Sequence, residues 1–291
     1  MASIKALSFG EVLWDVYPDR ICIGGAPLNF AAHLARHGNQ VFFVSSVGKD
    51  ELGRKALEQI EKWNVSTEYV SISKSLPTGQ CIVSLDGNGT PTYNILPDTA
   101  CDSISSDGIT QDFDLLYFGT FALRSKYNFN SLRSLIESHS FKEIFVDLNI
   151  RPPFSSDDAV IFALKNATII KISLEELPFV ARALNMNSSI AYRDFAKKLS
   201  SEFKAIKCII VTLGEDGAYA FEPQSGKESN CQAKKVSVLS TVGAGDSFSA
   251  AFLHQYFNNT LDHSLIYATK LAGYVVSKYE AVPDYNVEDL I

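Results

Sequence analysis

Segments typical of strands alternate with segments typical of helices along almost the whole chain of 291 residues. The strand candidates are short and apolar, and the helix candidates carry apolar residues on one face, as at Leu28, Ala31, Ala32 and Ala35. Strands are predicted at 4–10, 41–47, 114–119, 143–148, 167–172 and 207–213, and helices at 27–37, 50–63, 244–257 and 262–278. This order is typical of an α/β fold with a mainly parallel sheet.

Two stretches interrupt the alternation, at about 12–23 and 67–98. Both contain short runs typical of strands, and Asp-Gly-Asn-Gly at 86–89 is typical of a hairpin turn. The simplest arrangement is a small antiparallel sheet that projects from the α/β body and covers a cleft. Because no repeat or long linker divides the chain, we expect one domain that spans residues 1–291.

Composition excludes several classes of protein. The net charge of −7 comes from 26 basic and 33 acidic residues that are spread along the chain, so no nucleic-acid partner is expected. The five cysteines form no CxxC or Cys/His cluster, which argues against structural zinc and a disulfide framework. No apolar run is long enough for a signal peptide or a membrane span, so we expect no membrane contact and a cytoplasmic location.

The strongest local motif is TVGAGDSFSAAF, at residues 241–252. A predicted strand leads into Gly243, Ala244 and Gly245, and a helix then begins with Asp246. Glycines allow a ligand to approach the backbone, and the amides of a first helical turn bind anions. A carboxylate there stays ionised and can accept a hydroxyl proton during phosphoryl transfer. The same residues would also suit an ordinary helix cap after a glycine turn.

A second motif, GGAPLNFAAHLARHG, occupies residues 24–38. The pair Gly24 and Gly25 before a helix would let a polyol approach the backbone, and the Asn29 amide offers both a donor and an acceptor. Asp15, which follows the first predicted strand, could accept hydrogen bonds from two sugar hydroxyls. Taken singly, these residues would equally suit a turn, a helix face and a surface carboxylate.

The two motifs in this order resemble those of the PfkB (ribokinase-like) carbohydrate kinases, GGxxxN near the start and TxGAGD near the end. Three further segments are similar to the bacterial fructokinase branch: GEVLWD at 10–15, YFGTFALRS at 117–125 and VDLNIRPPF at 146–154. The resemblance implies a three-layer α/β/α sandwich with a small antiparallel β lid. It also implies transfer of the ATP γ-phosphoryl group to a sugar hydroxyl, and D-fructose giving fructose 6-phosphate is the favoured reaction.

The resemblance further implies a role for each matching residue. Asp246 would be the catalytic base, and the amides of Gly243, Ala244 and Gly245 the anion hole. The sugar would be held by Asp15, Gly24, Gly25, Asn29 and Arg151. The nucleotide would be bound by Lys171, Ser173, Thr212, Gly214 and Gly217, with Glu176 near Mg²⁺, directly or through water. Mg²⁺ must accompany ATP because the phosphate charge has to be neutralised during transfer. The lid would exclude water and, as in many relatives, pair across a homodimer.

Three positions depart from the family pattern. Ser240 stands where an aspartate usually opens the TxGAGD motif, and Glu280 stands where Gly-Ala is usual in a loop near a monovalent cation. Potassium dependence is therefore expected to be weak or absent. Ser173 replaces the asparagine of an Asn-x-x-Glu segment, which predicts weaker or reorganised magnesium and phosphate binding.

Two alternative functions remain open from the sequence. The chemistry could be the same with a different acceptor, such as 2-keto-3-deoxygluconate, ribose or a nucleoside such as adenosine. The fold could instead serve a sugar-binding regulator without turnover, a hypothesis that the three departures motivate. Intact Asp246 and its glycine-rich turn argue against the regulator.

Overall fold

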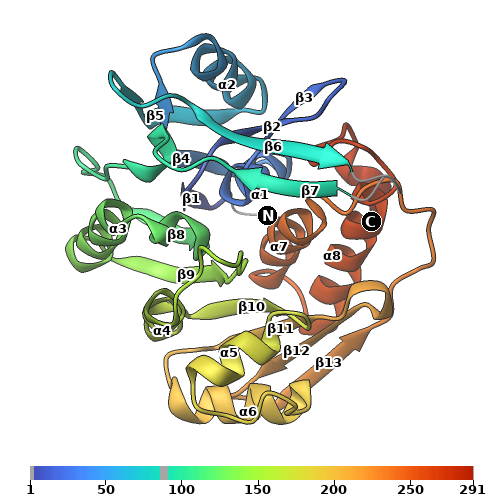
Figure 1. Ribbon diagram of the computed structural model, residues 1–291. Coiled ribbons are helices and arrows are strands. Elements are labelled where there is room, and N and C mark those ends of the chain that lie inside the picture. Colours follow the sequence, from blue (N-terminus) through green and yellow to red (C-terminus); the bar gives the residue numbers. More distant parts are fainter. Residues whose placement is uncertain (1–2, 86–90, 291) are drawn as a thin grey trace.

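A large twisted sheet forms the centre of the computed structural model, which describes residues 3–85 and 91–290 (Figure 1). Seven strands run parallel to one another and two antiparallel strands extend one edge, in the order β13-β12-β11-β10-β9-β8-β1-β4-β5. The strands are β1 (Lys5–Phe9), β4 (Gln40–Gly48), β5 (Val65–Ser73), β8 (Phe113–Phe118), β9 (Phe141–Asp147), β10 (Ile169–Ser173), β11 (Cys208–Thr212), β12 (Ala218–Glu222) and β13 (Lys227–Cys231). The predicted hairpin turn at 86–89 lies outside the described residues.

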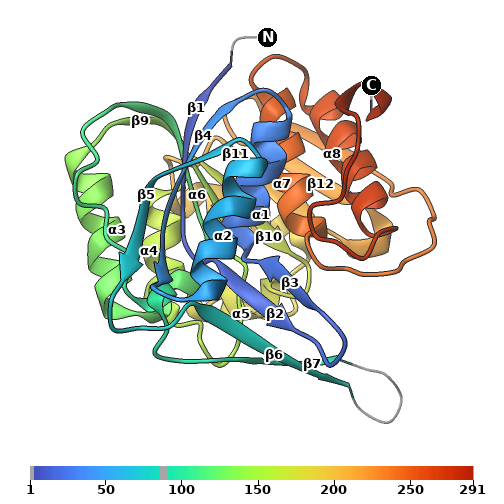
Figure 2. The ribbon, with the colours of Figure 1, turned by 90° about the horizontal axis from the view of Figure 1, so that it is seen from above.

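Helices cover both faces of this sheet, as Figures 1 and 2 show together. One face carries α1 (Ala26–Arg36), α2 (Glu51–Lys62), α7 (Ala244–Tyr256) and α8 (Leu261–Val275). The other carries α3 (Lys126–Ser138), α4 (Asp157–Asn166), α5 (Leu177–Ala183) and α6 (Tyr192–Glu202). The predicted three-layer α/β/α sandwich with a mainly parallel sheet is confirmed. Among the described helices, none combines the length and apolarity needed to cross a membrane.

The alternation of side chains along each strand divides the interior into two cores. In β8, Leu115 and Tyr117 belong to the core beneath α1 and α7, whereas Leu116 and Phe118 belong to the core beneath α3 and α4. Because both faces of the sheet are buried, the central strands carry apolar residues on both faces instead of alternating strictly with polar residues. This explains the continuous apolar runs in the sequence.

A second, smaller sheet contains β2 (Leu13–Val16), β3 (Ile21–Gly24), β6 (Gly79–Leu85) and β7 (Pro91–Ile95), in the order β3-β2-β6-β7. It consists of two antiparallel hairpins, as expected, joined by a parallel pairing of β2 with β6. Asp15 lies directly between Cys22 on one neighbouring strand and Cys81 on the other.

One predicted boundary of the small sheet is wrong. Residues 67–73 were expected in it, but they belong to β5, which pairs in parallel with β4 at the edge of the large sheet. The helix α2 supplies the crossover between these two strands, as a parallel pair requires. An alternating pattern identifies a strand but does not say which sheet it joins.

Candidate active site

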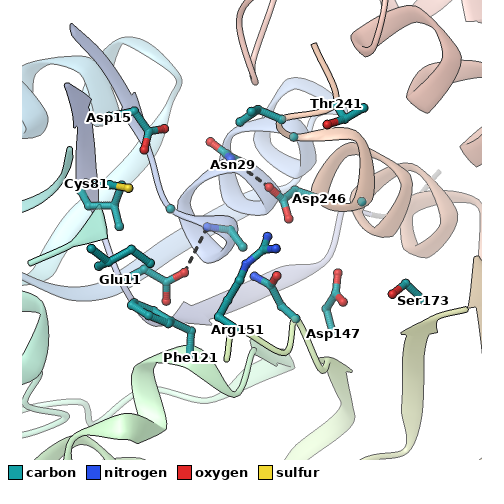
Figure 3. Close-up of a pocket in the computed structure, with 18 of the residues that line it drawn as sticks. Glu11, Asp15, Asn29, Cys81, Phe121, Asp147, Arg151, Ser173, Thr241 and Asp246 are labelled. Atoms are coloured by element: carbon teal, nitrogen blue, oxygen red, sulfur yellow. Dashed lines mark hydrogen bonds between the residues drawn. The ribbon is translucent and has the colours of Figure 1, made fainter. Parts of the chain in front are cut away.

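Most of the predicted site residues converge on a pocket of about 470 Å³ (Figure 3), a volume typical of small-molecule sites. The pocket lies where strands of the large sheet end, between the first turns of α1 and α7 and one face of the small sheet. It is lined by Glu11, Leu13, Asp15, Gly25, Ala26, Asn29, Cys81, Ile95, Phe121, Asp147, Asn149, Arg151, Lys171, Ser173, Glu176, Thr212, Thr241, Val242, Gly243, Gly245 and Asp246.

The glycine-rich turn opens α7 directly onto this pocket. Gly243 precedes the helix in the left-handed region, with φ of 78°, and a Cβ there would lie 2.5 Å from the carbonyl oxygen of Ala281. Only glycine fits this position. A Cβ at Gly245 would in turn lie 3.2 Å from Lys171 Nζ, so the absence of a side chain there leaves room for the ammonium group of Lys171. The first amides of a helix together with this lysine are well suited to phosphate oxygens.

Asp246, in the first turn of α7, is held by α1. Asn29 Nδ2 donates a hydrogen bond of 2.8 Å to Asp246 Oδ2, and the two side chains face each other in Figure 3. Burial, together with repulsion from Asp147, raises the pKa of Asp246 to about 6, although the hydrogen bond from Asn29 opposes this. Near pH 7 the group is therefore mainly ionised and basic enough to accept a proton.

Asp147 and Lys171 form a buried ion pair beneath the pocket. Lys171 lies opposite Asp147 in the register of β10 with β9, and its Nζ lies 2.8 Å from both carboxylate oxygens. Burial opposes the charge on Lys171, but the combined attraction of Asp147, Glu176 and Asp246 outweighs it, and the pKa of the ammonium is raised. Ser249 on α7 donates a third hydrogen bond to this carboxylate, of 3.1 Å. The lysine thus stays charged close to the glycine-rich turn.

Two further carboxyls lie on the side of the pocket nearest the small sheet. Burial raises the pKa of Glu11 to about 7 and that of Asp15 to about 6, and the nearby Arg151 opposes both shifts. Asn29 Oδ1 is buried and accepts no hydrogen bond within the described residues. The carboxyls of Glu11 and Asp15, with the guanidinium of Arg151 in the same lining, match the several hydroxyls of a polyol.

The glycine pair before α1 places the backbone against this cluster. Gly25 has φ of 119°, and a Cβ there would lie 2.3 Å from the Glu11 carbonyl oxygen. The next amide, that of Ala26, donates a hydrogen bond of 3.2 Å to Glu11 Oε1. Gly24 lies behind the pocket lining, where a Cβ would be 3.1 Å from Asp15 Oδ2. Gly25 therefore allows the close approach of the Glu11 backbone, and Gly24 makes room for the Asp15 carboxylate.

Glu176 and Ser173 fix each other at the far end of the pocket. Glu176 accepts from the amides of Ile150 (2.5 Å) and Ser173 (2.7 Å), one on each carboxylate oxygen. The Ser173 hydroxyl accepts from the Glu176 amide at 3.3 Å. Burial raises the pKa of Glu176, with the positive charge of Lys171 opposing. The serine therefore closes the local turn, and a metal ion would meet an already anchored carboxylate.

Some predicted residues lie at the margin of the site or beyond it. Thr212 lines the pocket at the end of β11, but Gly214 and Gly217 lie in the following turn and do not. A Cβ at Gly217 would lie 1.9 Å from the Cys231 carbonyl oxygen, so this glycine is required by the turn itself. Ala244 lies between two lining glycines without lining the pocket.

Sequence reasoning did not single out several lining residues. Glu11 and Asp147 sit inside quoted motifs, and a signal for both existed: each is a charged residue at the end of an apolar run. Phe121, Ile95 and Leu13 give the pocket an apolar wall. Within the described residues, no group of three or more His, Cys, Asp or Glu side chains is arranged to hold a metal ion.

A sequence model of the pfkB family carbohydrate kinases matches residues 20–286. The chain belongs to this family. It is a sugar kinase, an enzyme that transfers a phosphoryl group to a sugar hydroxyl.

Among members of this family, the chain is 29% identical to a fructokinase of Klebsiella pneumoniae and 27% identical to one of Salmonella typhimurium, in each case over 86% of this chain and 83% of the relative. The fold is similar to that of a fructokinase from Xylella fastidiosa with bound ATP, with a TM-score of 0.86, 20% identity and coverage of 98% of this chain and 97% of the other. The fold is also similar to that of a fructokinase from Vibrio cholerae with fructose, ADP and calcium bound. The TM-score is 0.83 at 23% identity, and the match covers 99% of this chain and 97% of the other.

Proposed function

We propose that this sugar kinase transfers the γ-phosphoryl group of MgATP to O6 of D-fructose, with Asp246 as the base. The observation that carries the proposal is the place of the Asp246 carboxylate. It lies between a glycine-rich helix start, which suits phosphate oxygens, and a cluster of acceptors that suits a polyol. The names of the relatives support fructose, and the Vibrio structure holds fructose with ADP.

In the proposed reaction, Asp246 takes the proton of the attacking sugar hydroxyl. The hydroxyl oxygen forms a bond to the γ-phosphorus, and the bond from that phosphorus to the bridging oxygen breaks, so that ADP leaves with the electron pair. The amides of residues 243–245 and the ammonium of Lys171 stabilise the charge on the phosphoryl oxygens. The protein supplies position and charge, with no covalent intermediate.

The neighbours of Asp246 adjust its basicity. Burial and repulsion from Asp147 raise the pKa of Asp246, which strengthens the base, and Asn29 orients the carboxylate through one oxygen. Asn29 Oδ1 is buried without a hydrogen-bond partner among the described residues, so the amide acts on the base through Nδ2. Arg151 is exposed within the pocket and is suited to contact the sugar or the transferred phosphoryl group.

Magnesium would neutralise the β- and γ-phosphates when it enters with ATP. Glu176 fits an indirect role, since backbone amides already engage both of its oxygens. The nucleotide would extend along Lys171, Ser173 and Thr212, which line the same end of the pocket. At Ser240, the hydroxyl accepts from the Val242 amide at 3.2 Å, which supports the proposal of a weak potassium requirement.

We further propose a cytoplasmic enzyme that forms a homodimer through the small sheet. Ile21 and Ile82 lie on either side of Val16 on one face of that sheet and are 45% and 37% exposed. A second copy would cover this apolar row. Light scattering should give twice the chain mass, and an Ile82→Lys variant should give the monomer.

The reaction is tested by measuring ADP release from MgATP with fructose, ribose, 2-keto-3-deoxygluconate, adenosine and glucose. The proposal predicts the highest kcat/KM with fructose, and phosphorus NMR of the product should show the ester at O6. A higher kcat/KM with another acceptor would retain the mechanism and change the substrate. Sugar binding without turnover, in sodium and in potassium, would favour a regulator.

A further inference from the structure

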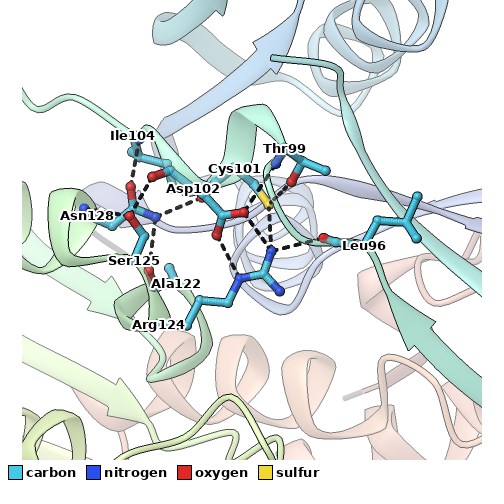
Figure 4. Close-up of polar contacts among 9 residues, drawn as sticks. All are labelled: Leu96, Thr99, Cys101, Asp102, Ile104, Ala122, Arg124, Ser125 and Asn128. Carbon is cyan, nitrogen blue, oxygen red and sulfur yellow. Dashed lines mark hydrogen bonds and ion pairs between the residues drawn. The ribbon is translucent and has the colours of Figure 1, made fainter.

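A buried arginine, Arg124, contacts the apolar wall of the pocket, and Figure 4 shows its polar contacts. It ends the short 3-10 helix η2 (Phe121–Arg124), in the segment that resembles fructokinases. Its side chain is only 8% exposed. This guanidinium does not line the pocket, so a catalytic role does not explain why it is buried. Its burial does require an explanation, because burying a charge costs free energy unless the charge is paired.

Arg124 joins two segments that are distant in sequence. Nε and Nη2 donate to the two carboxylate oxygens of Asp102, at 2.7 and 2.9 Å. Nη2 also donates 3.2 Å to the carbonyl oxygen of Leu96. Leu96 directly follows Ile95, the last residue of β7, and Ile95 lines the pocket. The arginine thus holds the backbone where the small sheet ends.

The flat guanidinium also packs against the aromatic part of the wall. Its central carbon lies 4.4 Å from the ring centre of Phe121 and 4.9 Å from that of Phe154. The two rings meet edge to face, with 5.7 Å between their centres. Phe121 lines the pocket, so one side chain fixes both Phe121 and, through Leu96, Ile95.

A second layer of hydrogen bonds immobilises this arrangement. Asn128 on α3 is fully buried and donates to the carbonyl oxygens of Cys101 (2.7 Å) and Ala122 (2.9 Å). Ser125 Oγ donates 2.5 Å to the carbonyl oxygen of Asp102. The turn that carries Asp102 and the turn that carries Arg124 are therefore held together independently of the ion pair. Loss of the ion pair should disturb the wall without unfolding either turn.

We propose that Arg124 is a positioning residue that sets the apolar wall of the sugar pocket and thereby the fit of the acceptor. The inference rests on the proposed function only in taking this pocket as the acceptor site. An aromatic ring against the C–H face of a sugar is sensitive to small displacements, since dispersion contacts weaken steeply with separation. Lys171 and the glycine-rich turn are not part of this network, so nucleotide binding should be unaffected.

The test compares Arg124→Lys with the double variant Arg124→Met/Asp102→Leu. Lysine keeps the charge beside Asp102 but cannot donate in fork geometry or stack as a plane. The double variant removes both charges, so neither is left buried and unpaired. For the best acceptor, KM should rise about tenfold in both, as expected for a pocket that fits its ligand less closely, while kcat and the KM for ATP change less than about twofold.

A double-mutant cycle tests whether Arg124 acts through the wall. Phe121→Leu should raise the acceptor KM by a similar factor, and adding Arg124→Lys should raise it little further, because both changes affect one contact. If the two substitutions instead raised the acceptor KM by independent factors that multiply in the double variant, the proposal would be overturned. Calorimetric binding of the acceptor to each variant gives the same comparison without turnover, so failure of the proposed reaction is distinguishable.

Arg193 offers a matched control. It too packs on an aromatic ring, 4.9 Å from the centre of Tyr219, and pairs with Glu228, but neither of these partners lines the pocket, whereas Phe121 does. Arg193→Lys should leave the acceptor KM unchanged. If Arg124→Lys behaves like Arg193→Lys, or if it lowers kcat and weakens both substrates equally, Arg124 supports the fold alone.

Discussion

Replacing Asp246, the proposed catalytic base, should stabilise the fold. The pKa of the Asp246 carboxyl is raised from its ordinary 3.8 to about 6 by burial and by Asp147, which corresponds to about 3 kcal/mol. The unfolded chain ionises at the lower pKa. The contribution of this carboxyl to the free energy of unfolding is therefore fully present below about pH 4 and is lost as the pH rises through about 6. Near pH 7.5, Asp246→Asn recovers it.

Because Asp246 is partly exposed, solvent screening reduces this gain, and we expect about 2 kcal/mol at pH 7.5. Calorimetry should show a rise in Tm of about 4 °C or more. The gain should shrink to a small fraction at pH 4, where the carboxyl is protonated in the folded state and half-protonated in the unfolded state. Asp107→Asn, an exposed change outside the pocket, should leave Tm unchanged. A less stable Asp246→Asn at pH 7.5, or an equal gain at both pH values, would refute the reasoning.

Three further predictions concern the surroundings of the base. His33, one turn beyond Asn29 on α1, forms a 2.9 Å hydrogen bond through Nε2 with the carbonyl oxygen of Ala281, which packs against the glycine-rich turn. His33→Leu should therefore lower kcat about tenfold, which is less than the loss expected when an anion-hole donor is removed. His37→Leu, a buried change one turn further on, should leave kcat unchanged. Equal kcat values for the two variants would contradict this. Asn29→Leu removes a hydrogen bond that lowers the pKa of the base, so the acidic limb of kcat against pH should move to higher pH, and an unmoved limb would exclude this role. Exchanging choline for potassium should change the rate little, because Ser240 carries no charge, and a large activation would show this wrong.

Much of the fold could be predicted because its signals are local. The apolar runs and the helix starts, predicted at residues 27 and 244 and observed at 26 and 244, each depend on neighbouring residues in the chain. The error at 67–73 has a different origin. Whether that strand pairs with β4 or with the small sheet depends on contacts across distant segments, which an alternating pattern does not encode.

The same distinction applies to the site. Gly243, Asp246 and Asn29 sit in local motifs, and the contact of Asn29 with Asp246 follows once the two helix starts face one pocket. Asp147 acquires its importance from the register that places it opposite Lys171, and this register was not readable from the sequence. The network of Arg124 likewise depends on segments that only the fold brings together.

The central claim is that Asp246 accepts the proton of the sugar hydroxyl, and the most direct measurement is fructose-dependent ADP release by Asp246→Asn. The asparagine preserves the size of the side chain and an acceptor for Asn29, so fructose and nucleotide should still bind by calorimetry. The account predicts a fall in kcat of at least about 10²-fold, the lower part of the range for general-base catalysis. Turnover near that of the parent, with binding intact, would contradict it.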